Sequence, residues 1–445
     1  MNQYFGTDGI RGRVGEKPML PDFFVKLGWA MGTLLARQGG SRIIMGKDTR
    51  MTGYMFEAAL QAGLTSAGID VYLTGPMPTP AIAYLTKSMH FDAGLIITAS
   101  HNPYQDNGVK FFSADGMKMS DQFEIEIEEK LKESIVLANP EKIGRVYRVE
   151  DAIDRYIKHA QSMFPSNLDL SGLKIIIDCA NGATYYLAPR IFSRLEAEVI
   201  AIGDQPDGIN INQYCGSTHP EVLQAKVLSE KADLGIAFDG DGDRLIMVDH
   251  LGEIVDGDEL LFIMVDAALR LGEPIHGVVG TFMTNLGLEK AMIERDIAFK
   301  RVRVGDRYVI EALKKEGWQM GGESSGHLIY LKYGTTGDGM MAALLVLAAM
   351  VLSKVSLNQI KQGMKKYPQS IINVPVAERI DPMTVEKIAS AVRKTEKTLG
   401  TRGRVLLRAS GTESLIRVMV EGDDRHMVST CADELAQVVS TAMGA

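Results

Sequence analysis

The sequence is poor in cysteine and has no long hydrophobic run. Its three cysteines, at positions 179, 215 and 431, are widely spaced and form no CxxC motif, so we expect neither a disulfide framework nor a zinc site. The longest apolar run, residues 340–352, is shorter than the roughly 20 residues of a membrane span and is typical of a buried helix. The opening residues, MNQYFGTDGIRG, lack both the basic and the apolar segment of a secretory signal. These absences favour a reduced, cytoplasmic compartment and no membrane partner.

Basic residues are not in excess either. The chain has 48 Lys and Arg against 56 Asp and Glu, a formal net charge of −8, which argues against non-specific nucleic-acid binding. An anionic substrate remains compatible with local basic clusters. With 46% hydrophobic and 23% charged residues, the composition is that of a folded globular protein. At about 150 residues per domain, the 445 residues predict three or four domains.

Short apolar runs without polar alternation recur along the first two thirds of the chain, at residues 41–46, 93–99, 173–178, 233–238 and 277–280. Helical patterns lie between them, for example over residues 53–67 and 221–231. This alternation predicts mixed, largely parallel α/β layers with strands buried on both faces. Three similar units each end in a polar loop after a strand: TASHNP, DGDGDR and GGESSGH. We therefore predict three related α/β domains, each placing one loop at the carboxyl end of a strand, where such sheets bind ligands.

The predicted domain boundaries are residues 1–150, 151–250, 251–365 and 366–445. The last domain has a different pattern, with a helix near 382–399, two strands joined by a loop, and a terminal helix, so it should be a smaller α+β domain. Residues 123–133, FEIEIEEKLKE, predict a solvent-facing helix with Glu126–Lys130 and Glu128–Lys132 pairs.

DGDGDR is the strongest metal signal. In an extended segment Asp239, Asp241 and Asp243 share one face, so three carboxylates converge and need a cation. Oxygen ligands of this kind select a hard ion, Mg²⁺ or Ca²⁺. An EF-hand is excluded because its glycine and glutamate positions would be Arg244 and His250. The alternative is a solvated Asp/Gly turn.

TASHNP places Ser100 at the end of a strand as a candidate nucleophile. In an extended chain the adjacent His101 would point away, so we expect that it is not simply the base for Ser100. Phosphoryl carriage is another use of this serine, since a metal loop could neutralise a phosphoserine. Lys110, further along, is a possible phosphate contact or proton carrier. The alternative is an ordinary turn, which Asn-Pro favours.

Three further motifs contain candidate ligands. In RASGTESLIR, a phosphate cradle would combine two guanidiniums, hydroxyls and a glycine amide: Arg408, Ser410, Gly411, Thr412 and Arg417. In GGESSGH, Glu323 and Ser325 could hydrogen-bond sugar hydroxyls, and His327 is either a ligand or a core histidine. FGTDGIRG presents Arg11 on a tight turn. Each motif alone could also be an ordinary turn.

Taken together and in this order, FGTDGIRG, TASHNPYQDNGVKFF, DGDGDR, GGESSGH and RASGTESLIR resemble the α-D-phosphohexomutase superfamily over the whole chain. Within it, FGTDGIRG and VGDRYV resemble the branch that acts on glucosamine phosphates. The phosphomannomutase/phosphoglucomutase branch has a Gly-His pair near Asp306 and Arg307, and Met in place of Ser324. One departure is Ser414, where the superfamily usually has Pro, which could loosen the phosphate loop without removing a ligand.

The resemblance implies four domains around a central cleft, with three related mixed α/β domains and a smaller α+β C-terminal domain. It implies that glucosamine 6-phosphate and glucosamine 1-phosphate interconvert through a phosphoserine and a 1,6-bisphosphate intermediate, feeding UDP-N-acetylglucosamine and cell-wall synthesis. Ser100 would carry the phosphoryl group, with Arg11, His101, Lys110 and Arg244 around it. Ser100, Asp239, Asp241 and Asp243 would hold one Mg²⁺. Sugar and phosphate contacts would come from Glu323, Ser325, His327, Arg408, Ser410, Gly411, Thr412 and Arg417.

Several points stay open at this level. The general base is Lys110 or His101, Ser100 needs priming by a kinase or a sugar bisphosphate, and a homodimer is possible. The alternative functions are a phosphomannomutase/phosphoglucomutase, a metal-dependent sugar phosphatase, or a sugar-phosphate-binding protein without catalysis. The phosphatase alternative is weakened because the DxDx[TV] pattern is missing after Asp241.

Overall fold

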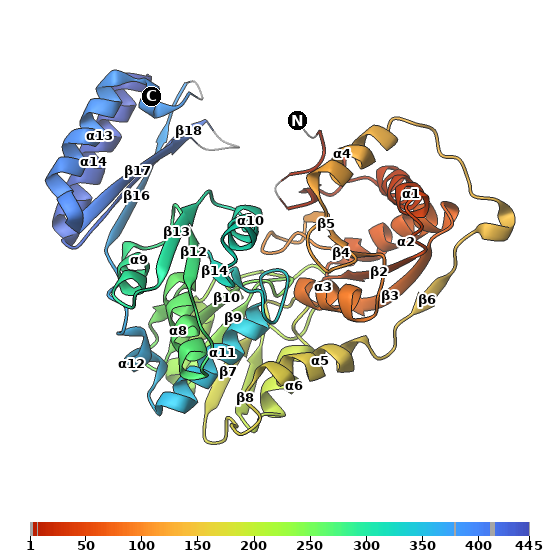
Figure 1. The fold of residues 1–445 in the computed structure, drawn as a ribbon, viewed down its shortest axis with the longest axis horizontal. Coiled ribbons are helices and arrows are strands. Elements are labelled where there is room, and N and C mark those ends of the chain that lie inside the picture. The colour runs from red at the N-terminus through yellow and green to blue at the C-terminus, as the bar shows by residue number, and fades with distance from the viewer. Residues whose placement is uncertain (1–2, 7, 378–379, 410–413, 445) are drawn as a thin grey trace. The chain divides into compact units, whose positions relative to one another are not determined.

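The computed structural model describes residues 3–6, 8–377, 380–409 and 414–444. By contacts the chain divides into two compact units, one reaching to Thr281 and including Val302–Gln362, the other containing Phe282–Arg301 and the chain from Gly363 onward. Figure 1 shows both units and labels many of their helices and strands. No helix in the described part of the chain combines the length and hydropathy needed to cross a membrane.

The first sheet of the larger unit has six strands in the order β1-β5-β4-β2-β3-β6. β2 is parallel to β3 and β4, and β5 runs antiparallel to β4 and β1. Helices α1 and α2 pack against each other, and α3 packs on β2 and β4. The elements are β1 (Ile10–Arg13), α1 (Pro21–Arg37), β2 (Arg42–Lys47), α2 (Met51–Ser66), β3 (Asp70–Pro76), α3 (Thr79–Ser88), β4 (Ala93–Ile97), β5 (Asp106–Ser113), α4 (Asp121–Lys130), η1 (Pro140–Lys142) and β6 (Val146–Arg148).

The second sheet has the order β11-β10-β9-β7-β8, in which β7 is parallel to β8 and β9, and β10 is antiparallel to β9. Its elements are α5 (Ala152–Met163), β7 (Lys174–Asp178), α6 (Leu187–Ser193), β8 (Glu198–Ile202), α7 (Glu221–Glu230), β9 (Leu234–Phe238), β10 (Leu245–Asp249) and β11 (Ile254–Val255).

In the third sheet β12 is parallel to β14, which pairs antiparallel with β15. The run 340–352 is the buried helix α11, which packs against α8, as the sequence predicted. The elements from this region are α8 (Gly257–Arg270), β12 (Gly277–Thr281), α9 (Leu286–Ile293), β13 (Ala298–Val302), α10 (Asp306–Glu316), β14 (Met320–Gly322), β15 (Leu328–Tyr330), α11 (Gly339–Ser353) and α12 (Leu357–Lys361).

The three sheets share one feature that positions the predicted loops. In each, a parallel strand is followed by an antiparallel neighbour, which gives the pairs β4–β5, β9–β10 and β14–β15. All residues of β4 and β9 are buried, which explains their unbroken apolar runs. The connection inside each pair is one of the three polar loops. The prediction of three related α/β domains is therefore confirmed.

The smaller unit contains an antiparallel sheet in the order β16-β18-β17, against which α14 and α13 pack. Its elements are β16 (Gln369–Pro375), η2 (Pro382–Thr384), α13 (Glu386–Leu399), η3 (Gly400–Arg402), β17 (Gly403–Ala409), β18 (Leu415–Gly422) and α14 (Arg425–Met443). The smaller α+β C-terminal fold predicted from the sequence is confirmed. The buried Glu421 carboxylate joins the 282–301 segment to this sheet by accepting the Leu286 N–H at 2.8 Å and the Arg404 Nε–H at 2.6 Å.

The ion pairs predicted along the acidic helix α4 are wrong. Lys130 pairs with Glu133, and Lys132 pairs with Glu129. The Glu128 carboxylate instead accepts the backbone N–H groups of residues 3–5, at 2.7, 2.7 and 3.0 Å. Helical spacing alone could not show that an N-terminal segment competes for this carboxylate. These three hydrogen bonds anchor the segment that leads into FGTDGIRG.

Candidate active site

Ser100 lies in the turn after β4 with a left-handed backbone, φ 51°. Its buried Oγ donates to Asp239 Oδ2 at 2.6 Å. The His101 Nδ1 lies 3.3 Å from the same Oγ, so the expectation that His101 points away from Ser100 is wrong. The reason is the backbone, because a left-handed residue turns the chain where an extended one would separate consecutive side chains.

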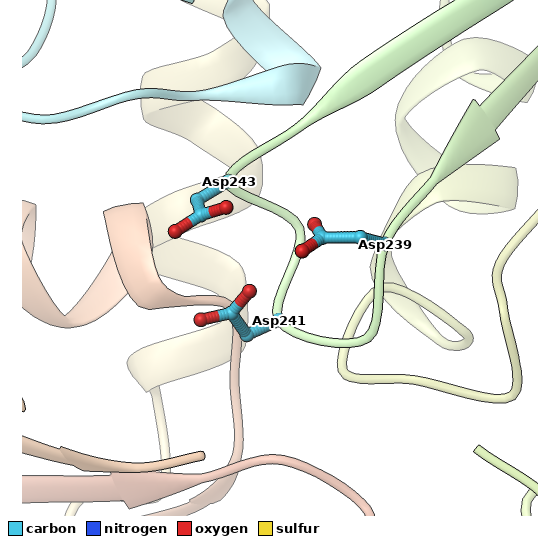
Figure 2. A group of neighbouring side chains, drawn as sticks. All are labelled: Asp239, Asp241 and Asp243. Atoms are coloured by element: carbon cyan, nitrogen blue, oxygen red, sulfur yellow. The ribbon is translucent and has the colours of Figure 1, made fainter. Parts of the chain in front are cut away.

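Asp239, Asp241 and Asp243 lie on the loop between β9 and β10, and their carboxylates turn toward one another (Figure 2). All three are buried, and one ligand oxygen from each lies within 4.8 Å of the others. Gly242, at φ 71°, supplies the left-handed position that lets the loop curl. Asp241 Oδ1 and Asp243 Oδ1 are buried without a hydrogen-bond partner. Oxygen donors with free buried lone pairs fit a hard divalent cation such as Mg²⁺.

Lys110 on β5 balances part of this negative charge. Its Nζ lies 3.0 Å from Asp241 Oδ2, 2.8 Å from Asp243 Oδ2 and 3.0 Å from Asp8 Oδ2. Burial opposes the charged amine, but the three carboxylates raise the pKa of Lys110 well above its usual value. Thr79 Oγ1 donates to Asp241 Oδ2 at 2.6 Å.

Burial and neighbouring charges shift the pKa values of two of these carboxylates in opposite directions. Burial, followed by the charges of Asp243 and Asp241, raises the pKa of Asp239 well above its ordinary value. Burial also acts on Asp243, but Lys110 and His327 outweigh it and lower that pKa well below the ordinary value. Without a cation the cluster therefore favours a proton at Asp239, which is the behaviour expected of carboxylates that converge on a metal site.

Two arginines lie beside the serine. Arg244 follows the acidic loop directly, and its Nε lies 4.0 Å from Asp243 Oδ1. Arg11 on β1 contacts Asp8 Oδ2 at 3.4 Å and Asn102 Oδ1 at 3.5 Å. Burial and the charges of these two arginines lower the pKa of His101 to about 4, so this imidazole is neutral at pH 7.

The GGESSGH loop between β14 and β15 contributes Glu323 and His327 to the same site. Glu323 Oε1 accepts the Gly305 N–H at 2.6 Å, and Ser325 Oγ lies 3.4 Å from Glu323 Oε2. His327 is buried, with Nε2 3.2 Å from the Gly337 nitrogen and Nδ1 3.6 Å from Asp243 Oδ1. Burial opposes a positive charge on this ring, but the Asp243 carboxylate outweighs it and raises the pKa of His327 to about 9, which makes His327 a cation beside Asp243 at pH 7.

A cavity of about 420 Å³ connects these groups, a size that suits a sugar phosphate. Of the residues predicted from the sequence, its wall contains Arg11, Ser100, Asp243, Arg244, Glu323 and His327. His101, Lys110, Asp239 and Asp241 adjoin it through the contacts given above, and Ser325 through Glu323. Three wall residues with polar side chains were missed by the sequence analysis: Tyr4, Asp8 and Asp306. Asp8 and Asp306 stand within FGTDGIRG and VGDRYV, so the motifs contained the signal.

The predicted phosphate cradle is described only in part. Arg408 on β17 and Arg417 on β18 stand directly opposite each other in the antiparallel register. Burial and the charge of Arg417 lower the pKa of Arg408 below its ordinary value, so an anion beside the pair would be stabilised. Ser410, Gly411 and Thr412 lie outside the described residues.

Comparison with known families identifies the class of protein. Four phosphoglucomutase/phosphomannomutase models match in succession: alpha/beta/alpha domain I over residues 2–135, domain II over 154–252, domain III over 256–367 and the C-terminal domain over 371–438. The fold and the serine, carboxylate and arginine groups thus define a phosphohexomutase.

Curated relatives narrow the family. The chain is 54% identical over 440 residues to the phosphoglucosamine mutase of Aeromonas salmonicida, with 99% of each chain covered. It is 53% identical over 441 residues to that of Sodalis glossinidius, again with 99% of each covered. The chain therefore belongs to the phosphoglucosamine mutase family.

Solved structures share the fold at low sequence identity. A phosphoglucomutase/phosphomannomutase family protein from Burkholderia thailandensis has a TM-score of 0.82 at 24% identity, covering 98% of this chain and 97% of its own. The N-acetylphosphoglucosamine mutase of Aspergillus fumigatus, in complex with GlcNAc-6P and magnesium, has a TM-score of 0.69 at 17% identity, covering 100% and 96%.

Proposed function

We propose that this protein is an isomerase that interconverts glucosamine 6-phosphate and glucosamine 1-phosphate through phosphorylated Ser100. The observation that carries the proposal is the 2.6 Å contact of Ser100 Oγ with the buried carboxylate triad, at the wall of a cavity that also contains Arg244. Membership of the phosphoglucosamine mutase family supports the amino-sugar substrate.

The reaction consists of two phosphoryl transfers. The bond between Ser100 Oγ and phosphorus breaks as the free hydroxyl of the sugar monophosphate bonds to phosphorus, and the proton that this hydroxyl gives up replaces the phosphoryl group on Ser100 Oγ. The resulting 1,6-bisphosphate turns end for end, and its other phosphoryl group returns to Ser100. The protein's part is positioning and charge stabilisation, and Arg244 is proposed to stabilise the migrating group.

Asp239, Asp241, Asp243 and an oxygen of phosphorylated Ser100 are proposed to hold one Mg²⁺. The ion would neutralise the charge of the phosphoserine and polarise its phosphoryl oxygens. The Aspergillus fumigatus complex with magnesium and GlcNAc-6P supports this assignment, and a variant of that enzyme in complex with glucose 1,6-bisphosphate supports the proposed intermediate.

We assign the uptake of the sugar hydroxyl proton to Lys110. With a pKa of about 4, His101 is a weak base at neutral pH. Lys110 is now held charged by Asp241 and Asp243, and a divalent cation on the same two carboxylates would lower its pKa toward the working range.

One carboxylate of the cavity wall, that of Asp306, favours a cationic sugar over a neutral one. Asp8 is paired with Lys110 and Arg11, and Asp243 with Lys110. Asp306 lines the same cavity, and burial together with the charge of Asp8 raises its pKa. A substrate ammonium group beside Asp306 would stabilise the charged carboxylate and so offset both the burial and the repulsion by Asp8.

The remaining contacts complete the proposal. Glu323 and Ser325 are proposed to hold sugar hydroxyls, and Arg408 and Arg417, with the 410–412 loop, the non-reacting phosphate. A kinase or a sugar bisphosphate must first phosphorylate Ser100, because the cycle starts from the phosphorylated form. We place the enzyme in the cytoplasm, where its product would serve UDP-N-acetylglucosamine and peptidoglycan synthesis.

A single-turnover experiment tests the proposal. Enzyme phosphorylated at Ser100 is mixed with glucosamine 6-phosphate and Mg²⁺, and the serine phosphopeptide and the sugar products are followed by mass spectrometry. The proposal expects phosphoryl loss from Ser100 to match bisphosphate formation. Release of inorganic phosphate at the same rate would instead indicate a phosphatase.

A further inference from the structure

Arg50 is a large buried side chain that the proposed reaction does not use. It has no exposed surface and follows β2 at the start of α2. Its guanidinium donates to four backbone carbonyls of the serine loop: Ser100 at 3.0 Å, Asn102 at 2.8 Å, Asp106 at 3.0 Å, and Pro103. One planar guanidinium group thus bonds the turn along its whole length, from residue 100 to residue 106.

The backbone N–H of Ser100 is also linked to Arg50, through Thr98 and Asp48. Arg50 Nε donates to Asp48 Oδ2 at 2.8 Å, and Thr98 Oγ1 donates to the same oxygen at 2.8 Å. The Ser100 N–H donates in turn to Thr98 Oγ1 at 2.9 Å. The amide and the carbonyl of Ser100 are therefore both bonded, directly or through Thr98 and Asp48, to Arg50.

Asn212, from the domain that contains the second sheet, also binds the serine loop. Its buried Nδ2 donates to the carbonyls of Ser100 and Asn102, at 2.9 and 3.0 Å. Gly240 of the acidic loop approaches so closely that a Cβ on it would lie 2.6 Å from the Ser100 carbonyl oxygen and 2.8 Å from the Asn212 side chain. Asn212 thus packs between the serine loop and the acidic loop.

The result is a constrained Ser100. An L-residue rarely adopts φ 51° unless its surroundings enforce it. Here the carbonyl of Ser100 has two buried donors, Arg50 and Asn212, and this conformation directs Oγ to Asp239 at 2.6 Å.

We propose that Arg50 and Asn212 are positioning residues that clamp the serine loop and align Ser100 with the carboxylate triad for phosphoryl transfer. The assignment rests on the function proposed above. Neither residue contacts the cavity directly, so their removal should change how Ser100 reacts and leave sugar-phosphate binding in place.

The test uses Arg50→Lys and Asn212→Gly, with Ser100 phosphorylated. Lysine keeps the positive charge beside Asp48 but cannot span four carbonyls. Glycine tolerates the φ of 58° at position 212 and removes the whole side chain, the Cβ together with the carboxamide. For each variant we expect kcat per folded molecule to fall about 100-fold, the effect of a displacement of about 1 Å. The KM for glucosamine 6-phosphate should stay within about two-fold, and the ³¹P resonance of the phosphoserine should shift.

Arg404→Lys is the matched control. Arg404 also pairs with a buried carboxylate, Glu421, and donates to two carbonyls, those of Phe282 and Thr284, at 2.8 and 2.7 Å. Loss of these bonds should lower stability by a similar mechanism while leaving the ³¹P signal of Ser100 unchanged.

Two results would overturn the clamp. One is a kcat within about three-fold of the unmodified enzyme in both variants, and the other is an equal loss of kcat and an equal ³¹P shift in Arg404→Lys. If Arg50→Lys fails to fold by circular dichroism, Asn212→Gly decides by the same criteria. An unmodified enzyme without mutase turnover would refute the proposed function instead. The ³¹P shift alone would then test the clamp.

Discussion

Replacing Asp239 with asparagine should make the metal-free protein more stable. One oxygen from each carboxylate of the triad lies within 4.8 Å of the others. At that separation two unit charges repel by about 3.5 kcal/mol at an effective dielectric constant of about 20. Burial and the charges of Asp243 and Asp241 raise the pKa of Asp239, so the unmodified protein escapes part of this repulsion by binding a proton there.

The size of the effect depends on pH. A carboxyl group whose pKa is raised by folding contributes stability that is fully present below its unfolded pKa, about 3.9, and is lost as the pH rises through the folded pKa. Across that window the unmodified protein loses about 1.4 kcal/mol per pH unit relative to Asp239→Asn. The asparagine keeps the shape of the side chain and can still bond the Ser100 hydroxyl and the Arg244 N–H.

Urea denaturation from pH 5 to pH 8 measures the free energy of unfolding without a cation, in EDTA, and with one, in excess Mg²⁺. In EDTA, the advantage of Asp239→Asn should grow with pH. In Mg²⁺, the unmodified protein should gain about 2.7 kcal/mol at a hundred-fold excess over the dissociation constant, and the variant much less. A variant that is less stable than the unmodified protein in EDTA at pH 8 would refute the reasoning.

Asp249→Asn is a control with the opposite expected sign. Asp249, at the end of β10, is buried like Asp239, but it pairs with Lys361 at 2.6 Å and accepts the N–H groups of Leu251 and Glu253. Burial acts to raise its pKa, but the bonds from Lys361 and its other donors prevail and lower it. The same chemical change should therefore lower stability at neutral pH.

Three further predictions concern catalysis. Arg244→Ala should lower kcat on the order of 10²–10³-fold in steady-state assays, the usual loss for one electrostatic donor, and near-normal turnover would remove Arg244 from the reaction. Asp306→Asn should lower kcat/KM for glucosamine 6-phosphate about ten-fold relative to glucose 6-phosphate, the effect of about 1.4 kcal/mol from one charged contact; an unchanged ratio would count against the ammonium contact. Lys110→Met should lower kcat by at least about 10²-fold and His101→Asn by less than ten-fold, and the reverse order would make His101 the base.

The parts of the fold and site that follow from local patterns were predictable. The buried strands β4 and β9 appear in the sequence as unbroken apolar runs, and the DGDGDR spacing by itself predicted that Asp239, Asp241 and Asp243 would converge. These features depend on residues within one strand–loop segment, so the sequence contains all of the information needed.

Other features depend on contacts between distant segments or on one backbone angle. Arg50 and Asn212 contact the serine loop from about 50 and 110 positions away in the chain, and nothing in their own surroundings indicates this. The contact of His101 with Ser100 follows from the left-handed φ of Ser100, which the clamp enforces. Glu128 has the spacing to pair along its helix, but its carboxylate instead accepts hydrogen bonds from the N-terminal segment.

The most direct test of the central claim is a comparison of kcat/KM for glucosamine, glucose and mannose 6-phosphates, with Mg²⁺ and a bisphosphate primer, for the unmodified enzyme and Ser100→Ala. The account predicts a strong preference for the amino sugar and no turnover by the variant. A preference for a neutral hexose would contradict the assigned substrate, and activity that survives in Ser100→Ala would contradict the phosphoserine mechanism itself.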